Sequence, residues 1–413
     1  MQKSITYQIL EAHTTDPIVE GNIVTVDVQS IMAHDGTGPV VAETLRKNNI
    51  TDLKACNHAM FNFDHYFPAK TAREAYLQKT AREFARKNGL EFYEGEGVCH
   101  HVMPEKGFLA PGTILVGSDS HTCTGGAFGI FATGLGASDV AGVLKTGKLW
   151  LEIPSVIRIK LIHQLREDVT VYDLALDIVY EVGFNGALGK SIEYFGPGVH
   201  SLNMDDRMRI SNFSVEMGAL TGIFEVDDTC IAWYEKFGKK YEGPQIRNVS
   251  EEYDLVIDLD KVVPRIAEPN KPSNSKPIEE VKKTKVDQVF IGSCSGGFYE
   301  DIVAAATILK EKKVNPSVRL LVCPATKATL NRCIQEGYIE TLMEAGATIM
   351  PVGCGSCLGN IGALADGEVE VATQNRNFTG RVGSKKAFIY LASAKQAAKI
   401  AISGYVGGKE NED

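Results

Sequence analysis

Three cysteines lie in glycine-rich loops that follow apolar, strand-like runs. Cys294 lies in GSCSGG after KVDQVFIG, whereas Cys354 and Cys357 lie in GCGSC after TIMPV. Flanking glycines let backbone N–H groups approach a ligand closely, and the N-terminus of a following helix stabilises a thiolate. Three thiolates in two such loops predict an iron–sulfur cluster or a zinc ion. With one thiolate fewer than the usual four, one metal position would stay open to substrate.

A redox role competes with metal binding at the second loop. Read alone, the spacing of Cys354 and Cys357 also resembles a thioredoxin-like dithiol, and the third cysteine in a matching loop favours metal. The chain has 9 cysteines, an odd number that argues against a disulfide framework. The isolated ones are predicted to be buried small hydrophobic residues: Cys56, Cys230, Cys323 and Cys333.

Two acidic–histidine motifs offer proton-transfer chemistry. Asp64 precedes His65 in NFDHYFP, and GSDSHT contains Asp119, Ser120 and His121. An adjacent carboxylate can orient an imidazole and raise its pKa, which makes a proton donor for a poor leaving group such as hydroxide. The alternative is that Asp-His is a common dipeptide and that Asp119 and Ser120 only cap the next helix.

Two further motifs are weaker signals. His100 and His101 stand together in GVCHHVMPEKG, and we expect one of them to be structural. Arg376 and Arg381 lie in NRNFTGR, beyond the strand-like run VEVAT. Guanidinium groups bind carboxylates bidentately, so two arginines in one loop suit a dicarboxylate or tricarboxylate substrate, although solvent-facing arginines and ion pairs are more common.

The elements that position these residues are predicted to be those of α/β domains. Short apolar runs alternate with helical periodicity, which predicts largely parallel sheets. GTILVG (112–117) reads as a buried strand, and the run from Pro68 to the stop signal Gly89 reads as a helix, as does VYDLALDIVYEVG. In open parallel sheets ligands gather beyond the carboxyl ends of strands. Five strand-end loops with reactive side chains therefore predict an assembled site.

The length of 413 residues predicts two or three domains. The segment VVPRIAEPNKPSNSKPIEEVKKTK (262–285) is rich in proline and polar residues and is predicted to be an extended linker. We therefore expect domains at 1–160, 161–284 and 285–413.

The composition of the chain argues against some classes of binding partner. The chain is 44% hydrophobic and 23% charged, with a formal net charge of −9, which argues against nucleic acid or an anionic membrane as the main partner. No apolar run reaches the length of a membrane span, and the opening MQKSITYQILEAHTTDP lacks the apolar core of a signal peptide. We expect a cytoplasmic protein that contacts neither nucleic acid nor membrane.

Taken together, GSDSHT, GSC, GCGSCLG and NRNFTGR resemble the aconitase superfamily of [4Fe–4S] hydro-lyases. The resemblance runs in order over essentially the whole chain, and the length is similar to that of the large-subunit branch, which includes 3-isopropylmalate dehydratase and homoaconitase. It implies three α/β/α domains with largely parallel sheets around a central iron–sulfur cluster. The swivelling fourth domain of aconitase would belong to a separate small subunit, which carries the catalytic serine. A heterodimer or heterotetramer is implied, with this chain inactive alone.

The resemblance also implies roles for individual residues. Cys294, Cys354 and Cys357 would bind a [4Fe–4S] cluster and leave one iron open, and Asp64 with His65 would form the acid pair. The other implied catalytic positions are His100, Asp119, His121 and Glu216. The implied substrate-binding positions are His34, Ser120, Asn212, Asn375, Arg376 and Arg381.

The implied reaction dehydrates a hydroxy di- or tricarboxylate and rehydrates it at the neighbouring carbon. A substrate of the 3-isopropylmalate type, as in leucine biosynthesis, is the first expectation, with 2,3-dimethylmalate, homoaconitate or methylcitrate types as alternatives. Gly296 replaces the Asn of the usual GSCTNG motif, and Gly125 replaces a His usual in the isopropylmalate branch. Thiol redox chemistry and RNA-binding regulation are alternatives of another class, and the acidity of the chain argues against RNA.

Overall fold

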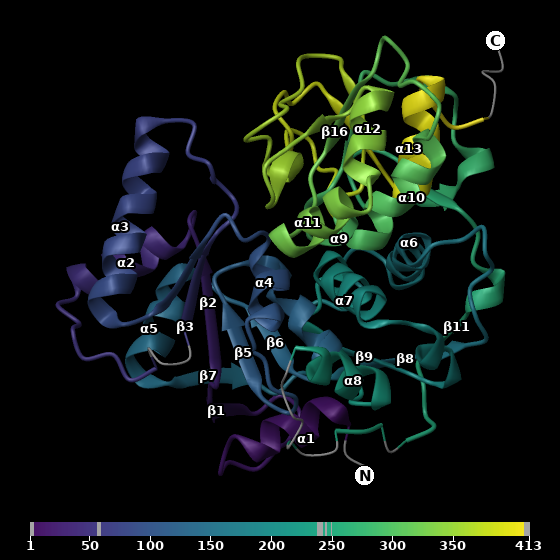
Figure 1. Cartoon of the computed structure of the whole chain (residues 1–413). Coiled ribbons are helices and arrows are strands. Elements are labelled where there is room, and N and C mark those ends of the chain that lie inside the picture. The colour runs from purple at the N-terminus through teal and green to yellow at the C-terminus, as the bar shows by residue number, and fades with distance from the viewer. Residues whose placement is uncertain (1–3, 56–58, 238–242, 244–245, 249, 409–413) are drawn as a thin grey trace. The chain divides into compact units, whose positions relative to one another are not determined.

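The computed structural model describes residues 4–55, 59–237, 243, 246–248 and 250–408 (Figure 1). The chain divides into two units, each formed from three segments. Unit 1 comprises Met1–Glu94, Val102–Gln164 and Asn185–Leu259. Unit 2 comprises Gly95–His101, Leu165–Phe184 and Asp260–Asp413. The three-domain division at 1–160, 161–284 and 285–413 stays a prediction.

The first large sheet of unit 1 is five-stranded and wholly parallel, in the order β4-β3-β2-β5-β6. Its strands are β2 (Ser30–His34), β3 (Ala59–Phe63), β4 (Glu91–Glu94), β5 (Ile114–Gly117) and β6 (Phe131–Gly134). Every residue of β2, β3 and β5 is buried, as expected for parallel strands covered on both faces. The helices beside this sheet in Figure 1 are α2 (Gly38–Lys47), α3 (Ala72–Asn88) and α5 (Ala137–Thr146).

Helix α3 shows how the sequence sets these boundaries. The Thr71 side chain accepts a hydrogen bond from the Glu74 N–H and so caps the first turn. Gly89 ends the helix in the left-handed conformation, with φ 67°, which a side chain would disfavour. The predicted helix and its stop signal at Gly89 are confirmed, although the helix begins at Ala72 and not near Pro68.

The second large sheet of unit 1 is four-stranded and parallel, in the order β10-β9-β8-β11. Its strands are β8 (Val156–Ile162), β9 (Ser191–Phe195), β10 (Thr221–Phe224) and β11 (Leu255–Asp258). A separate antiparallel ribbon pairs β1 (Ile23–Asp27) with β7 (Lys148–Glu152). The other helical elements are α1 (Ile5–Ala12), η2 (Ser120–Phe128), η3 (Pro197–Ser201), α7 (Met204–Phe213), η4 (Ser214–Met217) and α8 (Asp228–Lys236). Helix α4 (Cys99–Glu105) starts in unit 2 and ends in unit 1.

Unit 2 is built on a seven-stranded sheet in the order β13-β12-β19-β18-β15-β16-β17, in which β19 to β17 run parallel. These strands are β12 (Arg265–Ala267), β13 (Ser275–Pro277), β15 (Gln288–Ile291), β16 (Arg319–Val322), β17 (Thr348–Ile349), β18 (Val369–Ala372) and β19 (Phe388–Ala392). The helices are α6 (Val171–Val182), α9 (Ser293–Gly296), α10 (Tyr299–Leu309), α11 (Lys327–Gln335), α12 (Tyr338–Ala345) and α13 (Ala394–Ser403). The remaining elements are η5 (Leu259–Lys261), η6 (Ile278–Glu280), η7 (Gly355–Leu358) and the antiparallel pair β14 (Thr284–Lys285) and β20 (Tyr405–Val406).

The proline-rich segment 262–285 differs from the predicted free linker. It is extended, but β12 pairs antiparallel with β19 and with β13, so the segment forms the edge of the seven-stranded sheet. Ile266 and Ala267 are fully buried. The prolines are tolerated because they lie at the ends of an edge strand or between strands, where no ladder hydrogen bond is needed.

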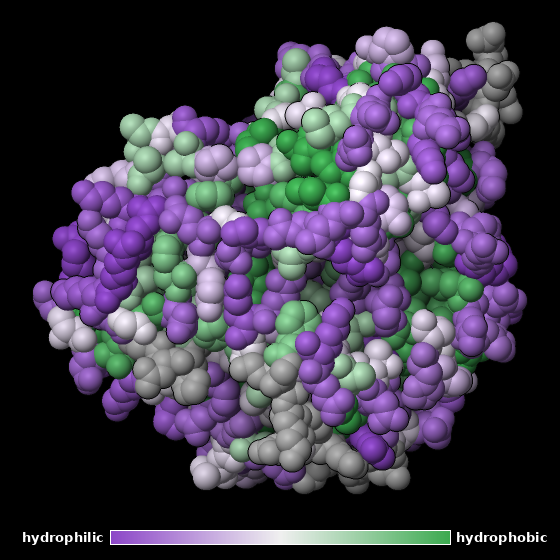
Figure 2. All heavy atoms as spheres, viewed as in Figure 1, coloured by the Kyte–Doolittle hydropathy of each residue, from purple (hydrophilic) through white to green (hydrophobic). Residues whose placement is uncertain are grey.

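The predicted α/β class with largely parallel sheets is therefore confirmed. No helix in the described part of the chain is long and apolar enough to cross a membrane. Figure 2 shows hydrophilic residues over much of the visible face and a group of hydrophobic residues over the loops of unit 2 that Figure 1 colours yellow-green.

A buried carboxyl in the centre of the unit 2 sheet makes stability depend on pH. Glu370 on β18 accepts a hydrogen bond from Gln288 Nε2 at 2.8 Å, and burial raises its pKa from 4.5 to about 7. As pH rises from 4.5 to 7, Glu370 ionises in the unfolded chain and keeps its proton in the folded chain, so the free energy of unfolding falls. The loss is about 3 kcal/mol above pH 7, at about 1.4 kcal/mol per pH unit.

Replacing Glu370 by glutamine removes this ionisation and keeps an acceptor for Gln288. We expect Glu370→Gln to stabilise the cluster-free chain by about 3 kcal/mol at pH 8 and by less than about 1 kcal/mol at pH 5. Guanidinium unfolding midpoints at both pH values measure the difference. An equal effect of the substitution at pH 5 and pH 8 would contradict the raised pKa of Glu370.

Candidate active site

The acidic and histidine motifs of unit 1 lie at the carboxyl ends of adjacent parallel strands. His34 ends β2, Asp64 and His65 follow β3, and Asp119 begins the loop after β5. Because β3, β2 and β5 are neighbours in the sheet, their polar ends gather at one edge. The strand-end pattern of the sequence is therefore confirmed for this unit.

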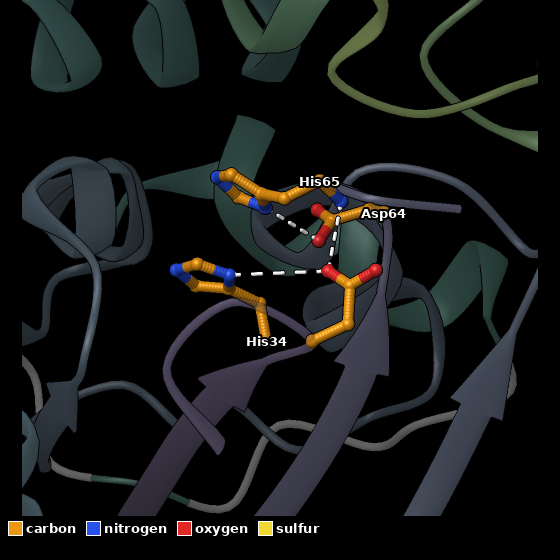
Figure 3. Close-up of side chains that lie close together, drawn as sticks. His34, Asp64 and His65 are labelled. Atoms are coloured by element: carbon orange, nitrogen blue, oxygen red, sulfur yellow. Dashed lines mark hydrogen bonds and ion pairs between the residues drawn. The ribbon is translucent and has the colours of Figure 1, made fainter. Parts of the chain in front are cut away.

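His65 lies between two carboxylates. Its Nδ1 is 2.7 Å from Asp64 Oδ1 and its Nε2 is 3.3 Å from Asp119 Oδ2, with the imidazole almost wholly buried. Figure 3 shows Asp64 and His65 turned toward each other beyond the strand ends. Two flanking carboxylates stabilise a positively charged ring, so this ring is suited to hold a proton and donate it.

The neighbouring His34 is in the neutral form. Its ring stacks on His65 with centroids 3.7 Å apart, and two positive charges at that distance would repel each other. The Gly36 N–H donates to His34 Nδ1 at 3.1 Å, so this nitrogen carries no proton and Nε2 faces Asp119 at 3.6 Å as the N–H. Of the two rings, His65 is the one whose contacts suit a positive charge.

Asp35 fixes the turn that carries this pair. The fully buried carboxylate accepts hydrogen bonds from the N–H groups of His65 and Tyr66, at 3.0 and 2.9 Å, and from Gln78 Nε2 at 3.1 Å. Burial and the nearby Asp64 carboxylate raise the pKa of Asp35. Asp35 thus ties the end of β3 to β2 and α3 and sets the direction of the His65 side chain.

The GSDSHT loop continues into the 3-10 helix η2. Asp119 caps it by accepting from the His121 N–H at 2.7 Å, so the capping interpretation is correct for Asp119, whose other carboxylate oxygen faces His65. His121 Nε2 lies 3.0 Å from Glu216 Oε1 on η4. Ser120 is half-buried at the first position of η2.

Asn212 holds the same helix from the other side. Its side-chain Nδ2 donates to Thr124 Oγ1 at 2.8 Å, and its backbone oxygen lies 3.5 Å from the Cys123 thiol. These two contacts tie α7 to η2. Unit 1 thus brings together seven of the expected site residues: His34, Asp64, His65, Asp119, His121, Asn212 and Glu216.

In unit 2, Cys294 lies in the one-turn helix α9 directly after β15. Its thiol is 3.3 Å from Asn375 Oδ1, which also accepts from Ser295 Oγ at 3.0 Å. Cys294 packs with Cys354 in a small buried cluster that includes Val98 and Ala325. Two of the three predicted metal ligands therefore lie in one small buried cluster, with the Asn375 amide beside Cys294.

The second cysteine loop follows β17. Cys354 directly precedes η7 and Cys357 lies within it, and they are 6% and 5% exposed. Cys323 lies beneath this loop, where its thiol donates to the carbonyls of Pro351 and Gly353 at 3.1 and 3.3 Å. Burial raises the pKa of the Cys323 thiol, so this cysteine is a hydrogen-bond donor and not a thiolate.

The arginine loop follows β18 and meets both cysteine loops. Asn375 contacts Cys294, while Arg381 Nη2 lies 3.5 Å from Cys357 Sγ. The backbone carbonyl of Arg376 accepts from Gln374 Nε2 at 2.7 Å, and its side chain is half-buried. Unit 2 therefore joins the cysteines and the arginine loop at the carboxyl ends of β15, β17 and β18.

The proline-rich segment also braces the arginine loop. Asn270 donates its N–H to Asn377 O at 3.0 Å, and its side-chain oxygen accepts from Thr379 Oγ1 at 2.8 Å. Asn377 Nδ2 in turn donates to Glu268 O at 2.7 Å. The segment predicted as a linker thus supports a loop of the candidate site.

The remaining cysteines test the prediction that isolated ones are packing residues. Cys230, Cys323 and Cys333 are fully buried, which confirms the prediction, and Cys56 lies outside the described residues. The described cysteines are all free thiols.

The thiols of Cys294, Cys354 and Cys357 form a donor set that fits an iron–sulfur cluster. They lie on two loops rich in glycine, and Gly353 and Gly355 take φ values of 143° and 57° that favour glycine. Arg381 and Asn375 supply polar contacts to two of the sulfurs.

Comparison with known proteins identifies the family. The family model described as "Aconitase family (aconitate hydratase)" matches residues 7–404. The chain belongs to the aconitase family. The predicted resemblance is therefore confirmed, and family membership implies an iron–sulfur cluster.

Similar members of the aconitase family are large subunits. The chain is 40% identical over 415 residues to 3-isopropylmalate dehydratase large subunit 1 of Methanopyrus kandleri, covering 98% of both chains. It is also 40% identical to the 3-isopropylmalate dehydratase large subunit of a Sulfurihydrogenibium species, covering 98% of this chain and 96% of the other. The probable methanogen homoaconitase large subunit of Methanosarcina mazei is 42% identical over 391 residues, covering 92% of this chain and 98% of the other. The name "large subunit" implies a small-subunit partner.

The two departures from the usual family motifs have a packing basis. A Cβ at Gly125 would lie 2.9 Å from both Ala132 Cβ and Leu115 Cδ2, so this position has no room for a histidine unless β5 and β6 shift. A Cβ at Gly296 would overlap the Thr373 side chain and lie 2.6 Å from its carbonyl oxygen. Thr373 instead uses its hydroxyl to bind the backbone of Gly292 at 2.8 Å.

We therefore expect Gly296→Ala to destabilise the unit 2 site by about 1–3 kcal/mol, the usual range for overpacking. Thermal unfolding of the variant and the wild type measures the effect. A wild-type transition for Gly296→Ala would contradict the close packing.

Sequence reasoning missed several residues of the site. Asp35, Thr124 and Cys323 each hold a site residue or its loop by a hydrogen bond. Asp35 follows His34 directly, a signal that was present in AHDGTGP. The other two act through contacts between segments far apart in the sequence, which no spacing rule reveals.

Proposed function

We propose that this chain is the large catalytic subunit of a [4Fe–4S] hydro-lyase that isomerises a hydroxy di- or tricarboxylate by dehydration and rehydration. The observation that carries the proposal is the His65 imidazole held between Asp64 and Asp119, in a chain of the aconitase family. A buried, charge-stabilised imidazole suits protonation of a departing hydroxide, the difficult half of this reaction.

Each residue of unit 1 takes a distinct part in this proposal. His65 donates the proton from Nε2, and Asp64 orients the ring and balances its charge at Nδ1. Neutral His34 presents an N–H toward Asp119 and binds substrate or orders that carboxylate. His121 with Glu216, and Asp119 with Ser120, provide the polar lining, and Asn212 holds η2 in place. His100 is proposed as a further catalytic residue.

Unit 2 would hold the cofactor and the substrate carboxylates. Cys294, Cys354 and Cys357 would bind a [4Fe–4S] cluster, which when bound supplies an open iron as Lewis acid for the substrate hydroxyl. Arg376 and Arg381 would bind carboxylates bidentately, with Asn375 donating from its amide. Fixing two carboxylates orients the substrate for elimination across one carbon–carbon bond.

The proposed partner is a small subunit that carries the swivelling domain and the serine base, in a heterodimer or heterotetramer. A 3-isopropylmalate-type substrate is the first candidate because relatives of that name cover 98% of this chain at 40% identity. Homoaconitate is the second candidate, favoured by the 42% identity to the Methanosarcina mazei chain. Other hydroxy acids of the same class, 2,3-dimethylmalate and methylcitrate types, belong in the same screen.

Anaerobic co-expression with a small subunit, followed by a screen of these hydroxy acids for alkene absorbance, tests the proposal. We expect turnover of at least one acid by the complex and none by either subunit alone. A cluster-loaded complex that turns over none of them would contradict the hydro-lyase proposal. Turnover that survives removal of iron and sulfide would contradict the role proposed for the cluster.

A further inference from the structure

The segment Gly95–His101 is built into unit 2 beside the cysteine loops. The Val98 N–H donates to Ala325 O, and the Lys327 N–H donates to Glu96 O, both at 2.8 Å. Gly97 has φ 126°, and a Cβ there would lie 2.5 Å from Thr326 Cα, so only glycine fits the crossing. The register of this segment against 325–327 is therefore fixed at several points.

Two side chains of this segment reach the first cysteine loop. Val98 is fully buried in the cluster that contains Cys294 and Cys354. His101 is 6% exposed, and its Nε2 lies 2.9 Å from the backbone oxygen of Cys294. A carbonyl oxygen only accepts, so Nε2 carries the proton and donates it. The ring is held by Phe298, with centroids 4.4 Å apart.

The Cys294 turn needs such partners because α9 is only one turn long. A helix end leaves its carbonyls without partners within the helix. Here Gly297 N–H donates to Ser293 O at 3.1 Å, and Thr373 Oγ1 donates to Gly292 O at 3.0 Å. His101 serves the carbonyl of the cysteine itself. The direction of the Cys294 peptide plane is therefore set by a side chain that lies 193 residues away in the sequence.

We propose that His101 is a positioning residue for the cluster: its Nε2–H holds the Cys294 carbonyl and so orients the Cys294 thiolate toward iron. The proposal rests on the proposed function, in which Cys294 is a cluster ligand. It assigns distinct tasks to two adjacent histidines, with His100 as the candidate site residue and His101 as the support of the metal ligand. Groups that hydrogen-bond to metal ligands commonly change metal affinity about 10–100-fold when they are removed.

Two substitutions separate the hydrogen bond from the packing. His101→Gln keeps an N–H donor at a similar reach, whereas His101→Phe keeps a ring against Phe298 and removes the donor. His200→Phe is the matched control, since the His200 side chain is 67% exposed in unit 1. After anaerobic reconstitution, the rate of cluster bleaching in air and the electron paramagnetic resonance spectrum of the reduced cluster are compared.

We expect His101→Phe to lose its cluster about tenfold faster than wild type and to show a shifted resonance spectrum. His101→Gln and His200→Phe should stay within about twofold of wild type, with the wild-type spectrum. Equal behaviour of His101→Phe and wild type, or equal loss in His101→Phe and His101→Gln, would overturn the proposal.

A cluster-free measurement keeps this test distinct from the proposed function. In the apo chain, amide hydrogen exchange of residues 293–298 should be faster in His101→Phe than in wild type, and unchanged in His101→Gln. If wild type binds no cluster, the proposed function fails and with it the metal role of His101. Wild-type exchange in His101→Phe would show that the hydrogen bond does not hold the turn, whatever the cluster does.

Discussion

Replacing Cys354 by alanine is expected to abolish cluster assembly and to lower hydro-lyase activity by at least about 10³-fold. Cys354 lies in the same buried cluster as Cys294 in unit 2 and is 6% exposed, so its loss leaves too few thiolates in the donor set. Iron and sulfide per chain after anaerobic reconstitution should fall from about four each to nearly none.

Cys333→Ala is the matched control for this prediction. Cys333 is fully buried in the core of unit 2 on α11, in the hydrophobic cluster that does not include the three predicted ligands. Removing its sulfur should cost some stability and leave iron and sulfide contents at the wild-type level. Equal loss of iron in Cys333→Ala and Cys354→Ala would show that folding, and not ligation, explains the effect.

The second large effect concerns the proton donor. Asp64→Asn keeps the size of the side chain and an oxygen for His65 Nδ1, but removes the negative charge that balances the imidazolium. We expect kcat to fall by about 10²–10³-fold with little change in KM, because general acid catalysis contributes about 10²–10⁴-fold. Steady-state kinetics of the reconstituted two-subunit complex measure the split between kcat and KM.

The control for Asp64→Asn is Asp52→Asn, since the Asp52 side chain is 77% exposed and pairs with Lys145 on the surface. It should leave both kinetic parameters unchanged. Iron and sulfide contents of both variants should match wild type, because Asp64 belongs to unit 1 and the cysteines to unit 2. A rise in KM with unchanged kcat for Asp64→Asn would assign Asp64 to binding instead of proton transfer.

The sequence predicted those parts of the site that follow local rules. Asp64, His65 and Asp119 stand directly after apolar runs, a pattern that predicts convergent strand-end loops, and these runs are adjacent parallel strands. Their individual roles come from the resemblance to the family. Cys294, Cys354 and Cys357 were identified by the same pattern together with their glycines. Strand alternation and turn composition are local properties, so one sequence is enough to reveal them.

The supporting residues depend on long-range packing and could not be read from the sequence. The link from His101 to Cys294 spans 193 residues, and that from Cys323 to Gly353 spans 30. The proline-rich segment 262–285 has the composition of a linker, and only its pairing with β19 shows that it belongs to the sheet. Composition indicates the conformation that a segment prefers in isolation, whereas strand pairing with other segments determines its conformation in the folded protein.

The central claim is that three cysteines hold a cluster whose fourth iron stays open to the substrate. Mössbauer spectroscopy of the ⁵⁷Fe-reconstituted wild-type complex, with and without hydroxy acid, tests it most directly. The proposed site predicts that about one quarter of the iron signal, one iron in four, changes when the acid is added, while the rest stays constant. A spectrum in which no iron responds to any acid of the screen, or in which no cluster forms at all, would contradict it.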